Sequence, residues 1–252
     1  MTCDLNAQRT ISQLIAERPG RVRVFERFGV DCCCGGSKTL VEACLEKGVD
    51  SQEVLRELYE YDHEVEKARR LEEMADWSKA GLAELTEHIE RTHHAYLKEE
   101  LPRLAALAQK VAHRHGARNA NLIKLADYFL AFKEQLELHM MKEDTVLFPM
   151  FKQLEQADSL PNFHCGSLAN PISVMEYEHV EADRLLGEMR RLTGNYTLPE
   201  DACNSYRALF SGLRDLESDM QAHVEKEDNH LFPRALAAEQ GLSGKQSGCC
   251  GH

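Results

Sequence analysis

The chain has 252 residues, of which 43% are hydrophobic, 29% are charged and 7% are aromatic, a composition typical of a globular protein with a mainly aliphatic core. Its 42 acidic and 30 basic residues give a formal net charge of −12, and the resulting negative field argues against general binding to nucleic acids or anionic membranes. The sequence has no apolar run long enough to span a membrane, and its first residues lack the pattern of a secretory signal.

The first 61 residues predict a small, separate helical domain. Short helical patterns follow one another at 10–17, 20–28, 38–47 and 51–60. Residues 62–78 are strongly charged, and we expect them to form a solvated helical linker.

A loop of three consecutive cysteines and two glycines separates the second and third of these helices. Cys33 and Cys34 come just before a predicted helix, whose N-terminus favours the thiolate form. Gly35 and Gly36 permit a tight turn that leaves the sulfurs accessible. Cys33 and Cys34 are therefore candidate reactive, catalytic thiols, and the alternative is a plain buried pair of small residues.

Residues 79–240 predict a four-helix bundle. Apolar residues recur there at three- and four-residue steps, and loop signals interrupt this pattern at 115–119, 159–171 and 194–199. Four long helices joined by such loops form an up-down-up-down bundle. Residues 241–252 are rich in glycine and serine, and we expect a flexible tail that carries Cys249, Cys250 and His252.

An internal repeat organises this bundle. Residues 139–149 and 223–233 are identical at seven of eleven positions, and each segment contains a histidine followed four residues later by a glutamate. A further histidine precedes each motif, His94 by 45 residues and His179 by 44. The bundle therefore consists of two copies of one helix pair.

The repeated residues have the chemistry of a metal site. A histidine and a glutamate four residues apart lie on one face of a helix, and a buried carboxylate is too costly to repeat for packing alone. Four histidines and two bridging glutamates suit two metal ions in a bundle core. We therefore predict six metal ligands: His94, His139, Glu143, His179, His223 and Glu227.

Two points stay open at the level of the residues. His93 is adjacent to His94 and lies nearer the centre of the apolar stripe, while the repeat spacing favours His94. Imidazole and carboxylate ligands suit iron or manganese, and zinc would also bind.

The nine cysteines are odd in number and partly adjacent, which favours free thiols in a reducing cytoplasm.

These features together resemble a known family. The motif from Asp31 to Gly36, followed by a hemerythrin-like bundle with two histidine–glutamate motifs that end in Leu-Phe-Pro, is similar to the iron–sulfur cluster repair proteins of the Repair of Iron Centres type. The resemblance covers residues 8–240. Cys32 departs from the family pattern as a third cysteine that could compete with its neighbours, and the tail Cys249-Cys250-Gly251-His252 lies outside that pattern.

The resemblance implies a cytoplasmic protein with two non-haem iron ions, joined by oxo and carboxylate bridges. Such a protein repairs iron–sulfur clusters damaged by nitric oxide or oxidative stress, by supplying or exchanging iron. The family's ligands fall on the same six residues, with His94 rather than His93, and its cysteines fall on Cys33 and Cys34. The implied partners are damaged iron–sulfur proteins and nitric oxide, and a homodimer is left open.

Two other functions use the same site. One is enzymatic reduction of nitric oxide to nitrous oxide at the di-iron centre, where two bound molecules would be brought together. The other is hemerythrin-like oxygen binding or sensing. Oxygen binding is disfavoured because both repeats carry glutamate at the fourth position and because it leaves the thiol domain without a role.

Overall fold

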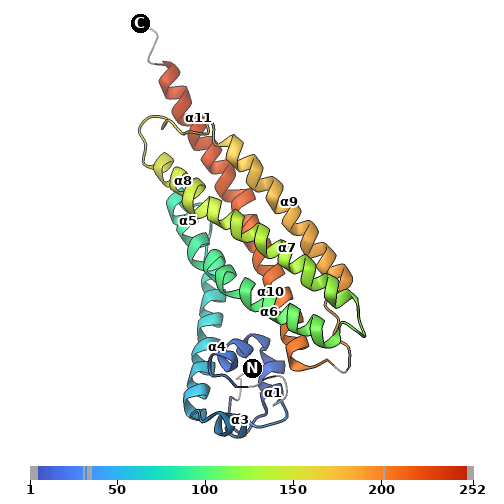
Figure 1. Cartoon of the computed structure of the whole chain (residues 1–252). Helices are drawn as coiled ribbons and strands as arrows, with labels where there is room; N and C mark the ends of the chain where they lie inside the picture. The colour runs from blue at the N-terminus through green and yellow to red at the C-terminus, as the bar shows by residue number, and fades with distance from the viewer. Residues whose placement is uncertain (1–4, 31, 33–35, 201, 249–252) are drawn as a thin grey trace.

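The computed structural model of the chain is built from helices (Figure 1). It describes residues 5–30, 32, 36–200 and 202–248. Within these residues the one feature other than helix and turn is an isolated antiparallel bridge between Thr10 and Thr39. The predicted all-α fold, a four-helix bundle with a small N-terminal helical part, is confirmed. No helix in the described part of the chain is long and apolar enough to cross a membrane.

The N-terminal helices begin at well-defined caps. They are α1 (Ile11–Glu17), the 3₁₀ turn η1 (Pro19–Arg21), α2 (Val22–Arg27), α3 (Leu40–Lys47) and α4 (Ser51–Met74). Thr10 and Thr39 each accept a hydrogen bond from the backbone N–H three residues later, in capping boxes closed by Gln13 and Glu42. These two caps fix the start of α1 and of the helix that follows the cysteine loop.

Helix α4 is longer than the pattern over 51–60 predicts. It continues without a break to Met74, so that the charged segment expected as a linker is largely its second half. The segment has no helix breaker, and pairs such as Arg70 Nε with Glu66 Oε1 (3.3 Å) support a solvated helix. Helix α4, the long blue-to-cyan rod in Figure 1, therefore connects the small N-terminal region to the bundle.

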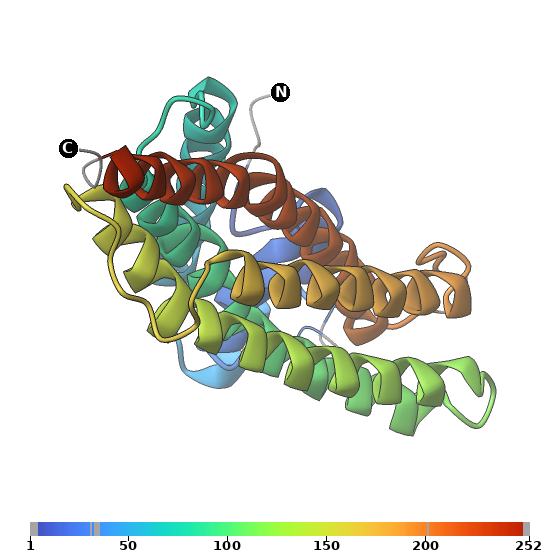
Figure 2. The same cartoon turned by 90° about the horizontal axis from the view of Figure 1, so that it is seen from above.

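Four antiparallel rods form the bundle (Figures 1 and 2). The first joins α5 (Leu82–Ile89), the π-helical turn η2 (Glu90–His94) and α6 (Ala95–His115), and the second joins α7 (Asn121–Lys142), the π-helical turn η3 (Glu143–Leu147) and α8 (Phe148–Glu155). The third is α9 (Ala169–Leu192), and the fourth joins α10 (Asn204–Lys226), the π-helical turn η4 (Glu227–Leu231) and α11 (Phe232–Gly248). Helix α6 packs on α7 and α10, and α7 packs on α9.

Pro149 and Pro233 do not end these rods. Each is the second residue of a helical segment that begins after a π-helical turn. The missing N–H of a proline is tolerated in the first turn of a helix. Pro102 lies inside α6, which runs through it.

The tail is helical further than predicted. We expected a flexible segment over 241–252, but α11 continues to Gly248. Leu242 is buried against the bundle, and the Ser243 hydroxyl donates to the Glu239 carbonyl at 3.0 Å, so packing overrides the weak helix propensity of the Gly/Ser residues. Cys249, Cys250 and His252 lie outside the described residues.

Two apolar clusters fill the interior. One includes Leu97, Phe129 and Leu216 in the bundle and continues into the N-terminal helices through Phe25 and Leu58. The other, toward the opposite end of the bundle, contains residues such as Ile89, Phe148, Met175 and Leu231. Along every rod the six predicted ligand residues fall between these clusters, so a buried polar layer interrupts the core.

Candidate metal centre

The structure brings all six predicted ligand side chains together at the middle of the bundle. His94 comes from the first rod, His139 and Glu143 from the second, His179 from the third, and His223 and Glu227 from the fourth. Their ligand atoms form two groups that share both glutamates, and within each group all atoms lie within 4.8 Å of one another. One group contains His94 and His223, and the other contains His139 and His179.

The two glutamates face both histidine pairs. Glu143 places Oε2 3.3 Å from His94 Nε2 and Oε1 3.2 Å from His139 Nε2. Glu227 places Oε1 2.9 Å from His223 Nε2 and Oε2 3.1 Å from His179 Nε2. Each carboxylate thus offers one oxygen to each group, which is the arrangement of a ligand that bridges two cations.

Histidine pairs of the two groups converge in the same way. The Nε2 atoms of His94 and His223 lie 3.2 Å apart, and those of His139 and His179 are also separated by 3.2 Å. Four nitrogens and four oxygens therefore point inward toward two positions. This donor set of imidazole and carboxylate suits iron or another first-row divalent metal.

The local helix geometry helps to aim these side chains. Glu143 and Glu227 are the first residues of π-helical turns, and His94 is the last residue of one. A π-helical turn inserts an extra residue into the helix and frequently occurs at functional sites. The histidine and glutamate of each motif still share one face because they are four residues apart.

The centre contains buried polar atoms that require a cation. Both carboxylate oxygens of Glu143, Oε2 of Glu227 and Nδ1 of His223 are buried and find no hydrogen-bond partner among the described residues. An uncompensated buried carboxylate costs several kcal/mol. Two metal ions would provide partners for the three carboxylate oxygens, so the residues present fit a dinuclear metal centre.

Three carboxylates outside the two groups fix the histidine rings. Asp144 Oδ1 accepts from His94 Nδ1 at 2.6 Å, Glu178 Oε2 from His139 Nδ1 at 2.9 Å, and Asp228 Oδ1 from His179 Nδ1 at 2.9 Å. Such contacts orient a ligand imidazole with Nε2 toward the metal and raise its basicity.

The charges of the centre shift the pKa values of its groups. Burial lowers the pKa of His94 and of His179, but the hydrogen bond that His94 donates to Asp144 and the nearby carboxylate of Glu143 outweigh this and raise the pKa of His94 to about 9. The hydrogen bond that His179 donates to Asp228 and the nearby carboxylate of Glu227 raise the pKa of His179 to about 10. Burial lowers the pKa of His223 despite the nearby Glu227. The metal centre therefore contains both positively and negatively charged side chains.

His93 lies outside both groups, although it is buried beside them. Its Nδ1 donates to Asp219 Oδ1 at 2.9 Å, and its Nε2 accepts from the Lys226 ammonium at 3.1 Å. Its ring is parallel to that of His223, with the centroids 5.2 Å apart. Of the two adjacent histidines, His94 is thus the one whose ring nitrogen points into the centre.

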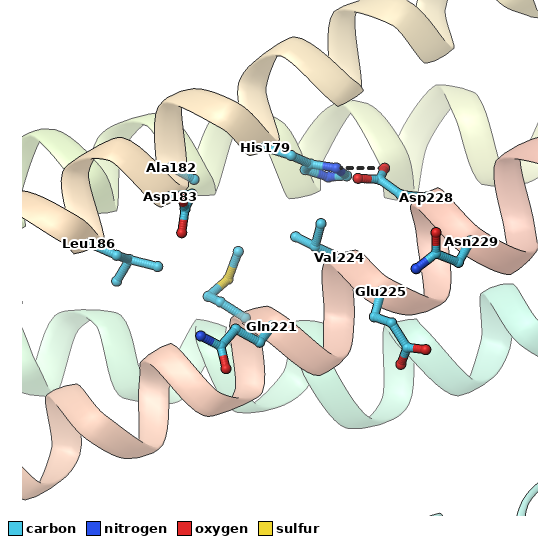
Figure 3. A pocket seen from close by; sticks show the side chains of 10 residues that line it. His179, Ala182, Asp183, Leu186, Gln221, Val224, Glu225, Asp228 and Asn229 are labelled. Carbon is cyan, nitrogen blue, oxygen red and sulfur yellow. Dashed lines mark hydrogen bonds and ion pairs between the residues drawn. The ribbon is translucent and has the colours of Figure 1, made fainter.

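A pocket between α9 and α10 reaches the centre beside His179 (Figure 3). It has a volume of about 320 Å³ and is lined by apolar side chains such as Leu186, Met220 and Val224, with Asp183 and Asp228 at its edge. A small, uncharged molecule could approach the His139–His179 group from this side.

Of the cysteine loop, the structure describes Cys32 and Gly36, which contact the bundle far from the metal centre. Cys33 and Cys34 themselves are outside the described residues. Their neighbour Cys32 accepts, through its carbonyl, a hydrogen bond from the Asn204 side chain at the start of α10. At a rise of about 1.5 Å per residue, the segment of α10 from Asn204 to His223 spans about 28 Å. A Cβ atom on Gly36 would collide with Asn204 and Ser12, so this glycine allows the loop to approach α10 closely.

Sequence reasoning missed the three carboxylates that support the histidines. Asp144 and Asp228 directly follow the two motif glutamates and are part of the repeat, so the repeat itself contained a signal for them. Glu178 has no counterpart of its own kind, because His93 occupies the corresponding position before His94. Only the three-dimensional contacts show its role.

The sequence of the chain matches two domain families and is similar to known iron–sulfur cluster repair proteins. Residues 86–235 match the model of the hemerythrin HHE cation binding domain, and residues 7–62 match a domain of unknown function, DUF542. The chain is 37% identical over 231 residues to the iron–sulfur cluster repair protein YtfE of Escherichia coli O157:H7, covering 91% of this chain and 97% of that protein. It is 36% identical over 230 residues to a probable iron–sulfur cluster repair protein of Haemophilus influenzae, with the same coverage.

Proposed function

Because the chain belongs to the family of iron–sulfur cluster repair proteins, we propose that it repairs damaged iron–sulfur clusters by supplying or exchanging iron from the di-iron centre of its bundle. The single observation that carries this proposal is the pair of bridging glutamates, each with one oxygen directed to each histidine pair. The six ligands would hold two iron ions.

The ligand set suits iron that must leave as well as bind. Imidazoles and carboxylates hold ferrous iron more weakly than ferric iron, whereas a closed thiolate site would retain the metal. The two glutamates would partly neutralise the charge of the two cations. Protonation of a glutamate would remove its negative charge and favour the release of iron. We propose that a change in iron oxidation state controls how readily the centre gives up its cargo.

The partners follow from this role. We propose that damaged iron–sulfur proteins receive the iron, and that nitric oxide and oxidants are the agents that damage them. Cys33 and Cys34 are proposed to accept or pass iron or a nitrosyl group. A reducing cytoplasm suits such thiols, and among the described residues Cys44, Cys165 and Cys203 form no disulfide. We also propose a homodimer, and the molar mass of the protein in solution would test it.

Loss of the bridging carboxylates tests the repair function. We expect the double substitution Glu143→Ala and Glu227→Ala to abolish both iron content and restoration of a [4Fe–4S] enzyme that nitric oxide has damaged. Glu176→Ala, at an exposed position of α9, is the matched control and should retain both properties. Full repair by the iron-free double variant would refute the proposal.

The pocket beside His179 favours a second candidate function, the reduction of nitric oxide. Its apolar lining suits a small uncharged molecule. Two bound ferrous ions would supply the two electrons that turn two nitric oxide molecules and two protons into nitrous oxide and water. Nitrous oxide from the reduced protein under excess nitric oxide, measured with and without Leu186→Trp to fill the pocket, separates this activity from iron supply.

A further inference from the structure

The two histidine groups are built from equivalent residues of the repeat, yet a residue next to the ligands differs between them. Lys142, Glu143 and Asp144 correspond to Lys226, Glu227 and Asp228, and His94 corresponds to His179. The residue before His179 is Glu178, while the residue before His94 is His93. A carboxylate in one copy of the repeat is therefore an imidazole in the other.

Glu178 supports its neighbouring ligand in two ways. Its Oε2 accepts the His139 Nδ1 proton at 2.9 Å, and its Oε1 accepts from the Lys142 ammonium. The lysine holds the carboxylate in place, and the carboxylate holds the imidazole. Together with Asp228 on His179, this gives a carboxylate partner to both histidines of the His139–His179 group.

His93 lies beside Lys226 and His223, the counterparts of Lys142 and His139, but it does not support its neighbouring ligand in this way. Lys226 donates to His93 Nε2 at 3.1 Å, as Lys142 does to Glu178. The other ring nitrogen of His93 donates to Asp219, so neither nitrogen is available to accept from His223. The two rings stack with an interplanar angle of 3°, and His223 Nδ1 is left buried without a hydrogen-bond partner in the part of the chain that the structure describes.

The two metal positions therefore differ in ligand support. In the His94–His223 group one imidazole has a carboxylate partner, and in the His139–His179 group both imidazoles have one. Loss of one such partner typically lowers metal affinity about 10–100-fold. We propose that the two irons are held unequally, and that the iron between His94 and His223 is the exchangeable one.

Exposure alone would suggest the reverse order. The pocket reaches the centre beside His179, whereas His94 and His223 are fully buried. Access governs how fast an ion leaves, and ligand support governs how tightly it is held at equilibrium. The test must therefore be an equilibrium measurement that also identifies which ion remains.

Equilibrium competition provides that measurement. The full-length di-ferrous protein is dialysed anaerobically against increasing concentrations of the ferrous chelator ferrozine, and iron per chain is measured. We expect a plateau at one iron per chain, with the two losses separated by about 10–100-fold in free chelator. Anomalous diffraction at the iron edge from protein held at this plateau should show the remaining ion between His139 and His179. A single joint loss, or an ion that remains between His94 and His223, would overturn the proposal.

Two reciprocal substitutions test the cause. His93→Glu places a carboxylate beside His223 and within reach of Lys226, and it should remove the plateau by strengthening the weaker position. Glu178→Gln should remove the plateau by weakening the stronger one about 10–100-fold, and it stays informative if His93→Glu does not fold. Glu176→Gln on the same helix is the matched control. A plateau unchanged in both variants would contradict the assignment.

This inference rests on the proposed function only in requiring two bound irons. A protein that releases both irons together but still restores damaged clusters would overturn the inequality and leave the repair function intact. A protein with the expected plateau but no repair activity would overturn the repair function alone. The two failures are thus distinguishable.

Discussion

At the residue scale, the centre depends on carboxylates that are buried for binding rather than for stability. Glu143 and Glu227 are completely buried. Burial raises the pKa of Glu227, but the charge and hydrogen bond of His223 and the nearby imidazole of His179 outweigh it and hold that pKa well below its usual range. The anionic form is therefore maintained where cations are expected. Replacing such a network by apolar residues is often neutral for stability or stabilising, so its presence in both repeats indicates function.

Substitution of the aspartates that support the histidines should lower iron affinity almost as much as substitution of the ligands. In Asp144→Asn the neutral amide is a weaker acceptor for His94 Nδ1, and the ion pair of Asp144 with Lys98 (2.7 Å) is lost. We expect iron affinity to fall about 10-fold or more, as measured by chelator competition. Asp158→Asn, at an exposed position, is the control. Equal affinity in the two variants would mean that Asp144 does not support the metal.

The repeat explains why the sequence pointed to the right part of the chain. It relates His139 to His223 and Glu143 to Glu227 without reference to any fold. Its spacing favours His94 over the adjacent His93, whereas the apolar stripe favours His93, and both histidines are buried. The direction in which a ring nitrogen points is decided by the π-helical turn that ends at His94, and no simple periodicity predicts that turn.

At the element scale, four rods with loops between them were predictable because apolar spacing and loop residues agree. The extension of α4 to Met74 and of α11 to Gly248 was not. Charged and small residues do not forbid a helix, and pairing or packing with neighbours decides whether it continues. The same reasoning applies to Pro149 and Pro233, which the preceding π-helical turns accommodate at the start of new segments.

The stability of the bundle should depend on the buried aromatic side chains of α7. Phe129 on α7 is fully buried, and its ring centroid lies 6.2 Å from that of Phe132. Phe129→Ala should lower the free energy of unfolding by about 3–5 kcal/mol, because it removes buried area and leaves a cavity. Urea denaturation of the metal-free protein measures this change without a contribution from bound iron.

The matched control for this substitution lies on the same helix. Ile123 of α7 is half exposed, and Ile123→Ala should change the free energy of unfolding by no more than about 0.5 kcal/mol. Similar losses in both variants would show that α7 does not bury the face described above.

At the scale of the whole molecule, the N-terminal helices and the bundle share one continuous apolar core. The apolar cluster that contains Phe25 and Leu58 also contains Leu97 and Leu216 of the bundle. Arg23 of α2 pairs with the buried Glu100 of α6 at 3.0 Å. The N-terminal helices are therefore packed on the bundle, and the contact of Cys32 with Asn204 lies about 28 Å along α10 from His223.

The contact at the start of α10 tests how firmly the cysteine loop is held. Asn204→Ala removes the hydrogen bonds from the Asn204 amide to the Cys32 carbonyl and to Ser12 Oγ. We expect a loss of about 1–2 kcal/mol in the free energy of unfolding and faster amide exchange in the residues next to the loop, with iron content unchanged. Ser218→Ala, at an exposed position of α10, is the control. Unchanged exchange in Asn204→Ala would contradict the docking contact.

The most direct test of the whole account is an anaerobic titration of the metal-free protein with ferrous iron, followed by calorimetry and Mössbauer spectroscopy. We predict that two irons bind per chain, that they form a coupled non-haem pair when oxidised, and that the loaded protein unfolds at a higher temperature, since a ligand at 100 times its Kd adds about 2.7 kcal/mol of stability. Binding of fewer than two irons, or a melting temperature that iron leaves unchanged, would contradict the dinuclear centre from which the repair function follows.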